Sequence, residues 1–214
     1  MAGTRRTLTP RQSERRARIL QTARELINEA GYEGMTTREL AARANVSPTT
    51  LFNLYNTKEE LLLAALREQL AGMNVEMMEA TPEPGLERLL AYQGIIADQL
   101  DRTPAYARAI VGTLIRGAPG EPMGQILLRG FLDTITECVE VMAEKRQLKD
   151  NVDTADLATT LLGAYWGVQL LWDKTILDAK DTRRMNMVSC LSTLIPATRG
   201  KTRKQLEAEL DKLR

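Results

Sequence analysis

The sequence predicts an all-α protein with a small N-terminal domain and a larger helical domain behind it. Apolar residues recur at helical spacing along most of the chain, and no stretch alternates with the period of two that a half-buried strand requires. Several helix-capping signals lie close together in residues 36–57, which predicts short helices there, whereas the later helices are long.

The first helix is predicted to begin after Thr9 and to end at Gly31. Thr9 and Gln12 have the spacing of a capping box, in which each side chain bonds the other residue's backbone N–H. Residues 1–8 contain two arginines and no periodicity, so we expect a flexible basic arm. Two interpretations of the arm stay open, a disordered terminus and a segment that enters a DNA minor groove.

Caps then predict two short helices joined by a tight turn. Thr36 and Ser47 have the side chains that cap helix N-termini, and Thr57 caps the helix that follows. Asn45 tolerates the left-handed conformation in which the first short helix must end. Roughly seven residues remain for the middle helix, which is about 10 Å at 1.5 Å per residue. Such a helix is too short to be stable alone but fits a DNA major groove about 12 Å wide, so the pattern predicts a helix-turn-helix.

Residues 31–62, GYEGMTTRELAARANVSPTTLFNLYNTKEELL, resemble the DNA-binding signature of the tetracycline-repressor (TetR) family of transcriptional regulators. Beyond residue 62 only the layout of long helices is similar. The resemblance implies an all-helical homodimer, most often a repressor, that binds double-stranded, palindromic operator DNA and releases it when a small molecule enters the larger domain. The family usually has Tyr at the position of Phe52 and aromatic residues at Asn53 and Leu54, so phosphate-binding groups are missing here.

The predicted DNA contacts combine hydroxyl, amide and cationic side chains. The amide of Asn53 can pair bidentately with adenine, and Lys58 is expected to contact phosphate alone. Tyr55 is left open between a core position and a phosphate contact. The predicted DNA-binding residues are Thr37, Arg38, Ser47, Pro48, Thr49, Thr50, Phe52, Asn53, Tyr55 and Lys58.

The charge distribution agrees with DNA binding at one end of the chain. The net charge is only +1, but residues 1–58 hold ten basic and five acidic residues. The remaining residues hold 19 basic and 23 acidic residues. A basic N-terminal part is typical of a surface that faces nucleic acid.

Composition excludes several classes of site. The chain has no His and two isolated cysteines, Cys138 and Cys190, which excludes a zinc finger and a His-ligated metal site. We expect no cofactor, and both cysteines to be reduced core residues of a cytoplasmic protein. No P-loop, GxSxG or similar motif is present, so the chain is not expected to be an enzyme. The longest uncharged run, Leu157–Trp172, is short for a membrane span and predicts a buried helix.

Four domain ranges follow from these patterns. Residues 1–8 form the arm, residues 9–57 the DNA-binding domain, residues 58–200 a ligand-binding and dimerisation domain, and residues 201–214 a charged tail. One helix from Thr57 to about residue 78 is expected to link the two domains mechanically. Further helices are predicted over residues 86–101, 104–116, 123–146, 155–176 and 182–195.

The larger domain is predicted to hold a small, largely apolar effector, because few charges fall on its inward-facing stripes. Each candidate is also an ordinary core residue, so packing alone stays an alternative. The predicted lining residues are Tyr92, Ile96, Gln99, Tyr106, Ile110, Phe131, Ile135, Trp166 and Gln169.

The last two long helices are apolar over wider faces than burial within one subunit requires, which predicts a homodimer with a four-helix interface. The predicted interface residues are Leu161, Tyr165, Val168, Trp172, Val188, Leu191 and Ile195.

The predicted function is thus a ligand-responsive, DNA-binding transcriptional regulator. Two alternatives stay open. A ligand-independent regulator or activator keeps the N-terminal domain but needs no cavity. A helical carrier or enzyme needs a catalytic constellation in residues 80–195, and the sequence offers none.

Overall fold

The computed structural model describes residues 9–117 and 121–214. Within these ranges the chain forms helices and no strand, which confirms the predicted all-α fold, and one isolated antiparallel bridge joins Leu148 to Thr198. The arm predicted at residues 1–8 and residues 118–120 of the loop after Gly117 lie outside the described residues. The helices are α1 (Pro10–Gly34), α2 (Thr37–Arg43), α3 (Pro48–Leu54), α4 (Lys58–Ala80), α5 (Leu86–Arg102), α6 (Pro104–Arg116), α7 (Pro122–Glu144), α8 (Thr154–Asp173), α9 (Ala179–Ala197) and α10 (Gly200–Asp211).

The chain divides into two compact units. The N-terminal unit contains the residues up to Leu70 together with Thr103–Ile110. The C-terminal unit contains Ala71–Arg102 and Val111–Arg214. Helices α4 and α6 each begin in the N-terminal unit and end in the C-terminal unit.

The helix ends in the N-terminal unit follow from local sequence signals. Thr9 forms the predicted capping box with Gln12 at the start of α1. Gly31 has φ 74°, which interrupts α1 where the sequence predicts its end, and the last helical residues follow to Gly34. These observations confirm the predicted bounds of the first helix to within a few residues.

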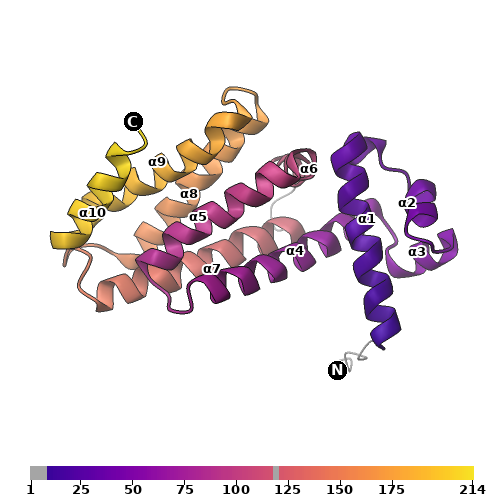
Figure 1. Ribbon diagram of the computed structural model, residues 1–214, viewed down its shortest axis with the longest axis horizontal. Coiled ribbons are helices and arrows are strands. Elements are labelled where there is room, and N and C mark those ends of the chain that lie inside the picture. The colour runs from indigo at the N-terminus through magenta and orange to yellow at the C-terminus, as the bar shows by residue number, and fades with distance from the viewer. Residues whose placement is uncertain (1–8, 118–120) are drawn as a thin grey trace. The chain divides into compact units, whose positions relative to one another are not determined.

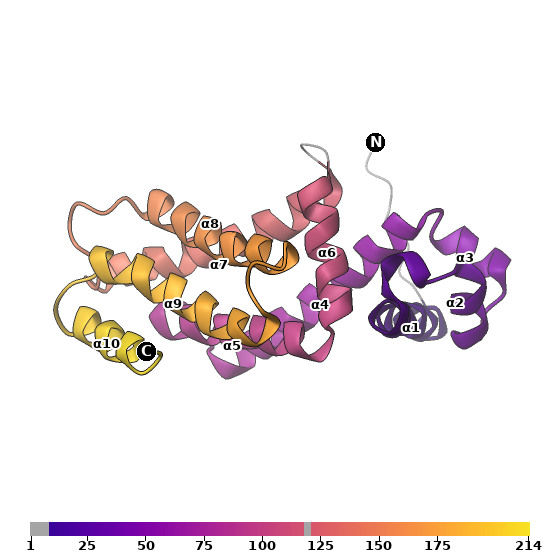
Figure 2. The same cartoon turned by 90° about the horizontal axis from the view of Figure 1, so that it is seen from above.

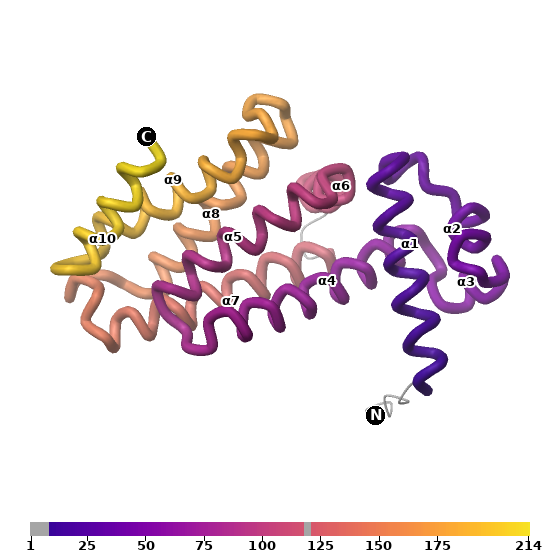
Figure 3. Tube along the Cα trace, viewed as in Figure 1, coloured from indigo at the N-terminus to yellow at the C-terminus, as the bar shows by residue number. Residues whose placement is uncertain are grey.

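The predicted helix-turn-helix geometry is confirmed at each cap. The Thr36 hydroxyl accepts from the backbone N–H of Glu39, and the Ser47 hydroxyl accepts from that of Thr50. Asn45, between α2 and α3, has φ 50° in the left-handed region. Helix α3 is seven residues long, and α2 packs against both α1 and α3 (Figure 3).

Helices α1, α2, α3 and the first half of α4 each bury apolar side chains in the N-terminal unit. Leu51 is the buried residue of α3 and is 3% exposed. The other three helices of the unit also contribute fully buried side chains, among them Ile19, Leu26, Ile27, Leu40, Leu61 and Leu62. Packing rather than intrinsic propensity therefore keeps α3 helical.

The C-terminal unit is built on a bundle of α5, α7, α8 and α9. Helix α8 packs against α7 and α9, and α5 packs against the same two helices (Figures 1 and 2). Helix α10, which forms most of the predicted charged tail, packs against α9. One end of the bundle has a wholly apolar core that contains Leu86, Leu89, Ile135, Cys138, Val139, Met142, Leu157, Leu161, Cys190, Leu191 and Leu194.

Several helix ends in this unit differ from the sequence prediction by two or three residues. Helix α8 ends at Asp173, before the predicted end at residue 176, where Thr175 turns left-handed with φ 58°. Helix α9 continues through Pro196 to Ala197. A proline in the last turn removes a single backbone donor, so the turn persists.

No helix in the described part of the chain is long and apolar enough to cross a membrane.

Asn45 provides a test of the turn. Replacing Asn45 by Ala should destabilise the protein by about 1 kcal/mol, because alanine lacks the polar side chain that makes the left-handed conformation tolerable. Asn45→Gly should stay within a few tenths of wild type. Urea unfolding measures the stability of both variants. An equal loss of stability for Ala and Gly would show that the left-handed backbone at residue 45 is not what makes Asn favourable there.

Candidate nucleic-acid interface

Helix α3 exposes one face and buries the other. Leu51 points into the core, whereas Thr49 and Asn53 are exposed. Phe52 is 63% exposed and Leu54 is 39% exposed, so two large apolar side chains of this short helix face solvent. A large apolar group at the surface, among polar neighbours, is typical of a binding surface.

Most of the predicted DNA-binding residues lie at exposed positions of the N-terminal unit. The exposed ones are Thr37, Arg38, Ser47, Pro48, Thr49, Phe52 and Asn53. Thr50 and Lys58 are half-buried, and Tyr55 is buried. The hydroxyls of Ser47 and Thr50 lie 2.8 Å apart and bond each other.

A surface pocket of about 390 Å³ lies beside α3. Its walls combine the exposed face of α3 with residues from the start of α2 and of α4. The lining residues are Thr37, Pro48, Thr49, Leu51, Phe52, Tyr55, Asn56, Thr57, Lys58 and Leu61.

Tyr55 supports α3 from inside the unit. Its side chain is 7% exposed, and the guanidinium of Arg16 lies 5.8 Å from the ring centroid. Burial raises the pKa of the Tyr55 hydroxyl, although the nearby Arg16 charge opposes the shift. The ring of Tyr55 is buried at the end of α3, and it still forms part of the wall of the pocket that Phe52 lines.

Lys58 is held by the end of α1. Its ammonium Nζ donates to the Tyr32 carbonyl oxygen at 2.9 Å and lies 5.0 Å from the Tyr32 ring centroid. Burial, followed by the Glu59 charge, raises the pKa of Tyr32 to about 12. Since an ammonium has three donors, Lys58 keeps donors for a second partner.

Some arginines of this unit bond neighbouring helices, and others are exposed and remain available to DNA. The sequence alone did not distinguish the two groups. The Arg18 Nε donates to the Ala44 carbonyl at 2.9 Å and so ties α1 to the end of α2. Arg43 pairs with Glu29 and Glu39. Arg11, Arg15 and Arg38 are exposed, and no polar partner is recorded for them among the described residues.

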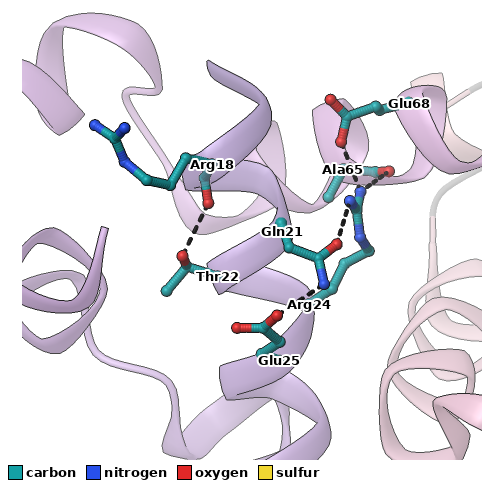
Figure 4. Close-up of polar contacts among 7 residues, drawn as sticks. All are labelled: Arg18, Gln21, Thr22, Arg24, Glu25, Ala65 and Glu68. Carbon is teal, nitrogen blue, oxygen red and sulfur yellow. Dashed lines mark hydrogen bonds and ion pairs between the residues drawn. The ribbon is translucent and has the colours of Figure 1, made fainter. Parts of the chain in front are cut away.

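Arg24 joins α1 to α4. Figure 4 shows its Nη1 donating to the Ala65 carbonyl at 3.2 Å and to the Glu68 carboxylate at 2.9 Å, while Nη2 donates to Gln21 at 2.8 Å. The Arg24 side chain is 16% exposed. Sequence reasoning missed Arg24, because its partners in α4 are more than 40 positions away.

Some predicted effector-binding residues come together in the C-terminal unit. The Phe131 ring centroid lies 5.6 Å from that of Tyr92 and 6.2 Å from that of Trp166, and Tyr165 completes the cluster at 5.9 Å from Phe131. Gln169 is fully buried, and its Nε2 donates to Asn186 Oδ1 at 3.0 Å.

Two polar atoms in this region have no hydrogen-bond partner among the described residues. They are Nε1 of Trp166 and Oε1 of Gln169, and both are buried. A buried donor and a buried acceptor without partners cost free energy.

The other predicted effector-binding residues have no contact with this aromatic cluster that the structure identifies. Ile135 belongs to the apolar end of the bundle, Ile96 is buried in α5, and Gln99 is half-buried. Tyr106 and Ile110 belong to the N-terminal unit, where Tyr106 is fully buried.

The predicted dimer residues fall into two groups. Leu161, Tyr165, Val168, Trp172 and Leu191 are each at most 8% exposed within the single chain. Val188 and Ile195 are partly exposed.

Helix α8 also has an outward face of small and apolar residues. Gly163 and Gly167 are exposed, and a Cβ built at either position meets no atom within 4 Å. Leu170 and Leu171 continue this face and are 43% and 44% exposed.

Cys138 and Cys190 are buried free cysteines, as predicted, and burial raises the pKa of both thiols. In the described ranges no group of three or more His, Cys, Asp and Glu side chains is placed to hold a metal ion.

The N-terminal unit is similar in sequence to the DNA-binding part of known bacterial transcriptional regulators. Residues 19–65 match the family model described as bacterial regulatory proteins, tetR family. The chain is 31% identical over 110 residues to the HTH-type transcriptional regulator YezE of Bacillus subtilis, covering 50% of this chain and 56% of YezE. It is 27% identical over 131 residues to the HTH-type transcriptional repressor KstR of Rhodococcus jostii, covering 59% of this chain and 62% of KstR.

The fold similarity extends over most of the chain. The structure of the Thermus thermophilus repressor FadR in complex with lauroyl-CoA has a TM-score of 0.63 and 25% identity, and the match covers 86% of this chain and all of FadR. The curated relatives are named as regulators or repressors, which agrees with the expectation that this chain is not an enzyme. The chain spans little more than half of the length of YezE and KstR.

Arg24 is predicted to stabilise the N-terminal unit. Arg24→Met should lower the free energy of unfolding by about 1–3 kcal/mol, since it removes bonds to Ala65 and Glu68. Glu68→Gln, the matched control, keeps a hydrogen-bond acceptor at a carboxylate position that is 37% exposed, so its loss should be below about 1 kcal/mol. Chemical denaturation measures both, and a loss for Glu68→Gln as large as that for Arg24→Met would contradict the assignment.

Proposed function

Because the chain belongs to the TetR family of bacterial regulatory proteins, we propose that it is a ligand-responsive transcriptional repressor that binds a palindromic operator as a homodimer. The observation that carries this proposal is the exposed face of α3. On this face the ring of Phe52 and the amide of Asn53 are exposed, while Leu51 anchors the opposite face of the helix by burial. Arg38 and Lys58 lie on either side of α3 in the sequence and supply positive charge for phosphates.

In the proposed complex, α3 enters the major groove and the surrounding residues contact the backbone. Asn53 and Thr49 contact base edges. Arg38 binds phosphate from the first turn of α2, and Lys58 binds phosphate with the donors that Tyr32 leaves free. Tyr55 has a supporting role beneath α3, since it is buried.

The proposed homodimer pairs the outward faces of α8 and α9 with their symmetry mates. Gly163 and Gly167 let two helix backbones approach closely, and Leu170 and Leu171 supply apolar area. Val188 and Ile195 add to this surface from α9. A twofold axis would then present two copies of α3 to one duplex, in successive major grooves about 34 Å apart.

The proposed effector site is the cluster of Tyr92, Phe131, Trp166 and Gln169 inside the bundle. Three aromatic rings suit a largely apolar molecule, and the unpartnered Trp166 and Gln169 atoms suit one or two polar groups on it. The structure of FadR with lauroyl-CoA gives a precedent for a ligand in a related fold. Effector binding would favour a spacing of the two α3 helices that no longer fits the operator.

The DNA contacts predict two kinds of variant. Arg38→Ala should weaken binding to every duplex similarly and lower the slope of log K against log salt by about 1, because it removes a phosphate contact. Asn53→Ala should instead reduce the preference for operator over other sequences, by about 1–3 kcal/mol. Fluorescence anisotropy titrations at several salt concentrations measure both effects. Lys204→Ala, at an exposed position of α10, is the control, and operator binding like wild type by both variants would refute the assigned surface.

If α8 forms the dimer interface, larger side chains on its outward face should separate the subunits. Gly163→Leu combined with Gly167→Leu should yield a folded monomer at micromolar concentration, since both side chains have space within one chain but not between two helices. Gly130→Leu on α7 is the matched control, because a Cβ there also meets nothing within 4 Å. Sedimentation velocity measures the outcome. A wild-type monomer at micromolar concentration, or a dimeric double variant, would contradict the interface.

The effector site predicts a ligand response confined to the bundle. In a thermal-shift screen of uncharged, largely apolar compounds, a true effector at 100 times its Kd should stabilise the protein by about 2.7 kcal/mol. The shift should disappear in Phe131→Ala and persist in Phe52→Ala. A screen without any stabilising compound, or a shift that survives Phe131→Ala, would favour the ligand-independent regulator instead.

A further inference from the structure

The surface of α3 carries no charge. From Ser47 to Tyr55 the sequence is SPTTLFNLY, with no Lys, Arg, Asp or Glu. Arginine and lysine are the side chains that most often read guanine in the major groove, by bonding O6 and N7 together. Helix α3 therefore lacks the usual means of selecting a G·C pair.

The exposed groups of α3 instead match adenine and thymine. Residues three and four positions apart share a helix face, so Thr49, Phe52 and Asn53 face the same side. The Asn53 amide pairs with adenine N6 and N7, and apolar groups such as Phe contact the C5-methyl group of thymine. Thymine alone among the four bases of DNA offers that methyl group in the major groove.

Phe52 is placed to make such an apolar contact. Its ring is 63% exposed and forms part of the wall of the pocket of about 390 Å³, together with Thr37 and Lys58. Hydroxyl and ammonium groups across this pocket suit a phosphodiester strand, which leaves the ring to the base edges. A phenyl ring has no donor for phosphate, so its favourable interaction is the burial of apolar surface.

We propose that α3 reads A·T pairs and that Phe52 selects thymine through its C5-methyl group. This inference rests on the proposed function and deepens it, because it names the chemical group on the operator that sets sequence preference. Burying one methyl group contributes enough for about fourfold in affinity, and the two half-sites of a palindrome together give about 15-fold.

Deoxyuridine substitution tests the proposal, since uracil differs from thymine only by the missing methyl group. Duplexes bound by the full-length wild-type protein are first selected from a random library. Each thymine of the selected half-site is then replaced by deoxyuridine, symmetrically in both halves, and Kd is measured. We expect the half-site to be rich in A·T pairs. At one thymine of the half-site, replacement by deoxyuridine in both halves should raise Kd about 15-fold.

Variants assign the lost affinity to Phe52. Phe52→Ala should bind the thymine and deoxyuridine duplexes equally, whereas Asn53→Ala should keep the wild-type ratio between them. Phe52 is exposed, so its replacement leaves the core intact, and circular dichroism checks the fold.

Two results would overturn the inference while leaving the proposed function in place. One is a selected site at which no deoxyuridine weakens binding. The other is the same deoxyuridine penalty in Phe52→Ala as in wild type. Failure to retain any duplex at low salt would instead refute both the proposed function and the inference.

Discussion

A helix of seven residues cannot hold its own shape in water, and the account of this protein depends on how α3 is kept helical. Ser47 caps its first turn, and the left-handed Asn45 sets the direction in which it leaves α2. Leu51 and Tyr55 fix it from below by burial. Because these contacts use one face, Thr49, Phe52 and Asn53 stand exposed on the other, with no polar partner among the described residues of the unit.

Helix α4 connects this surface to the C-terminal unit. At its start, Lys58 bonds the Tyr32 carbonyl, and about two turns further on Arg24 bonds the Ala65 carbonyl. Beyond its end, Arg88 of α5 donates to the backbone carbonyls of Thr81 and Pro82 and pairs with Glu137 of α7. A shift of α5 or α7 around an effector would therefore be felt at the end of α4. In the proposed effector response, α4 is the helix that joins the two units and so carries such a shift toward α3.

The N-terminal unit was predictable from sequence because its determinants are local. Thr9, Thr36, Asn45 and Ser47 act through spacings of three or four residues, which a sequence displays directly, and each has the predicted role in the structure. The partner of Lys58 is 26 positions away, and no local pattern reveals a bond to a backbone carbonyl.

The C-terminal unit was less predictable because α8 is apolar around much of its circumference. Sequence alone could not decide which side packs within the chain. Leu161 and Trp172 are buried against neighbours, whereas Leu170 and Leu171 are exposed. The glycines of α8 gain meaning only with the structure, which leaves open space at Gly163 and Gly167. The cluster around Phe131 likewise depends on how α5, α7 and α8 pack, and spacing along one helix does not encode it.

The central claim, that two copies of α3 enter one duplex, can be tested by directed DNA cleavage. Both native cysteines are buried, so Thr49→Cys provides an exposed thiol that can carry an iron chelate. On a selected operator this conjugate should cut the DNA in two clusters whose centres lie about one helical turn, roughly 34 Å, apart. A conjugate at Lys204→Cys in α10 should not cut at those positions. A single cluster, or cleavage by the Thr49 conjugate no stronger than that by the α10 conjugate, would contradict the account.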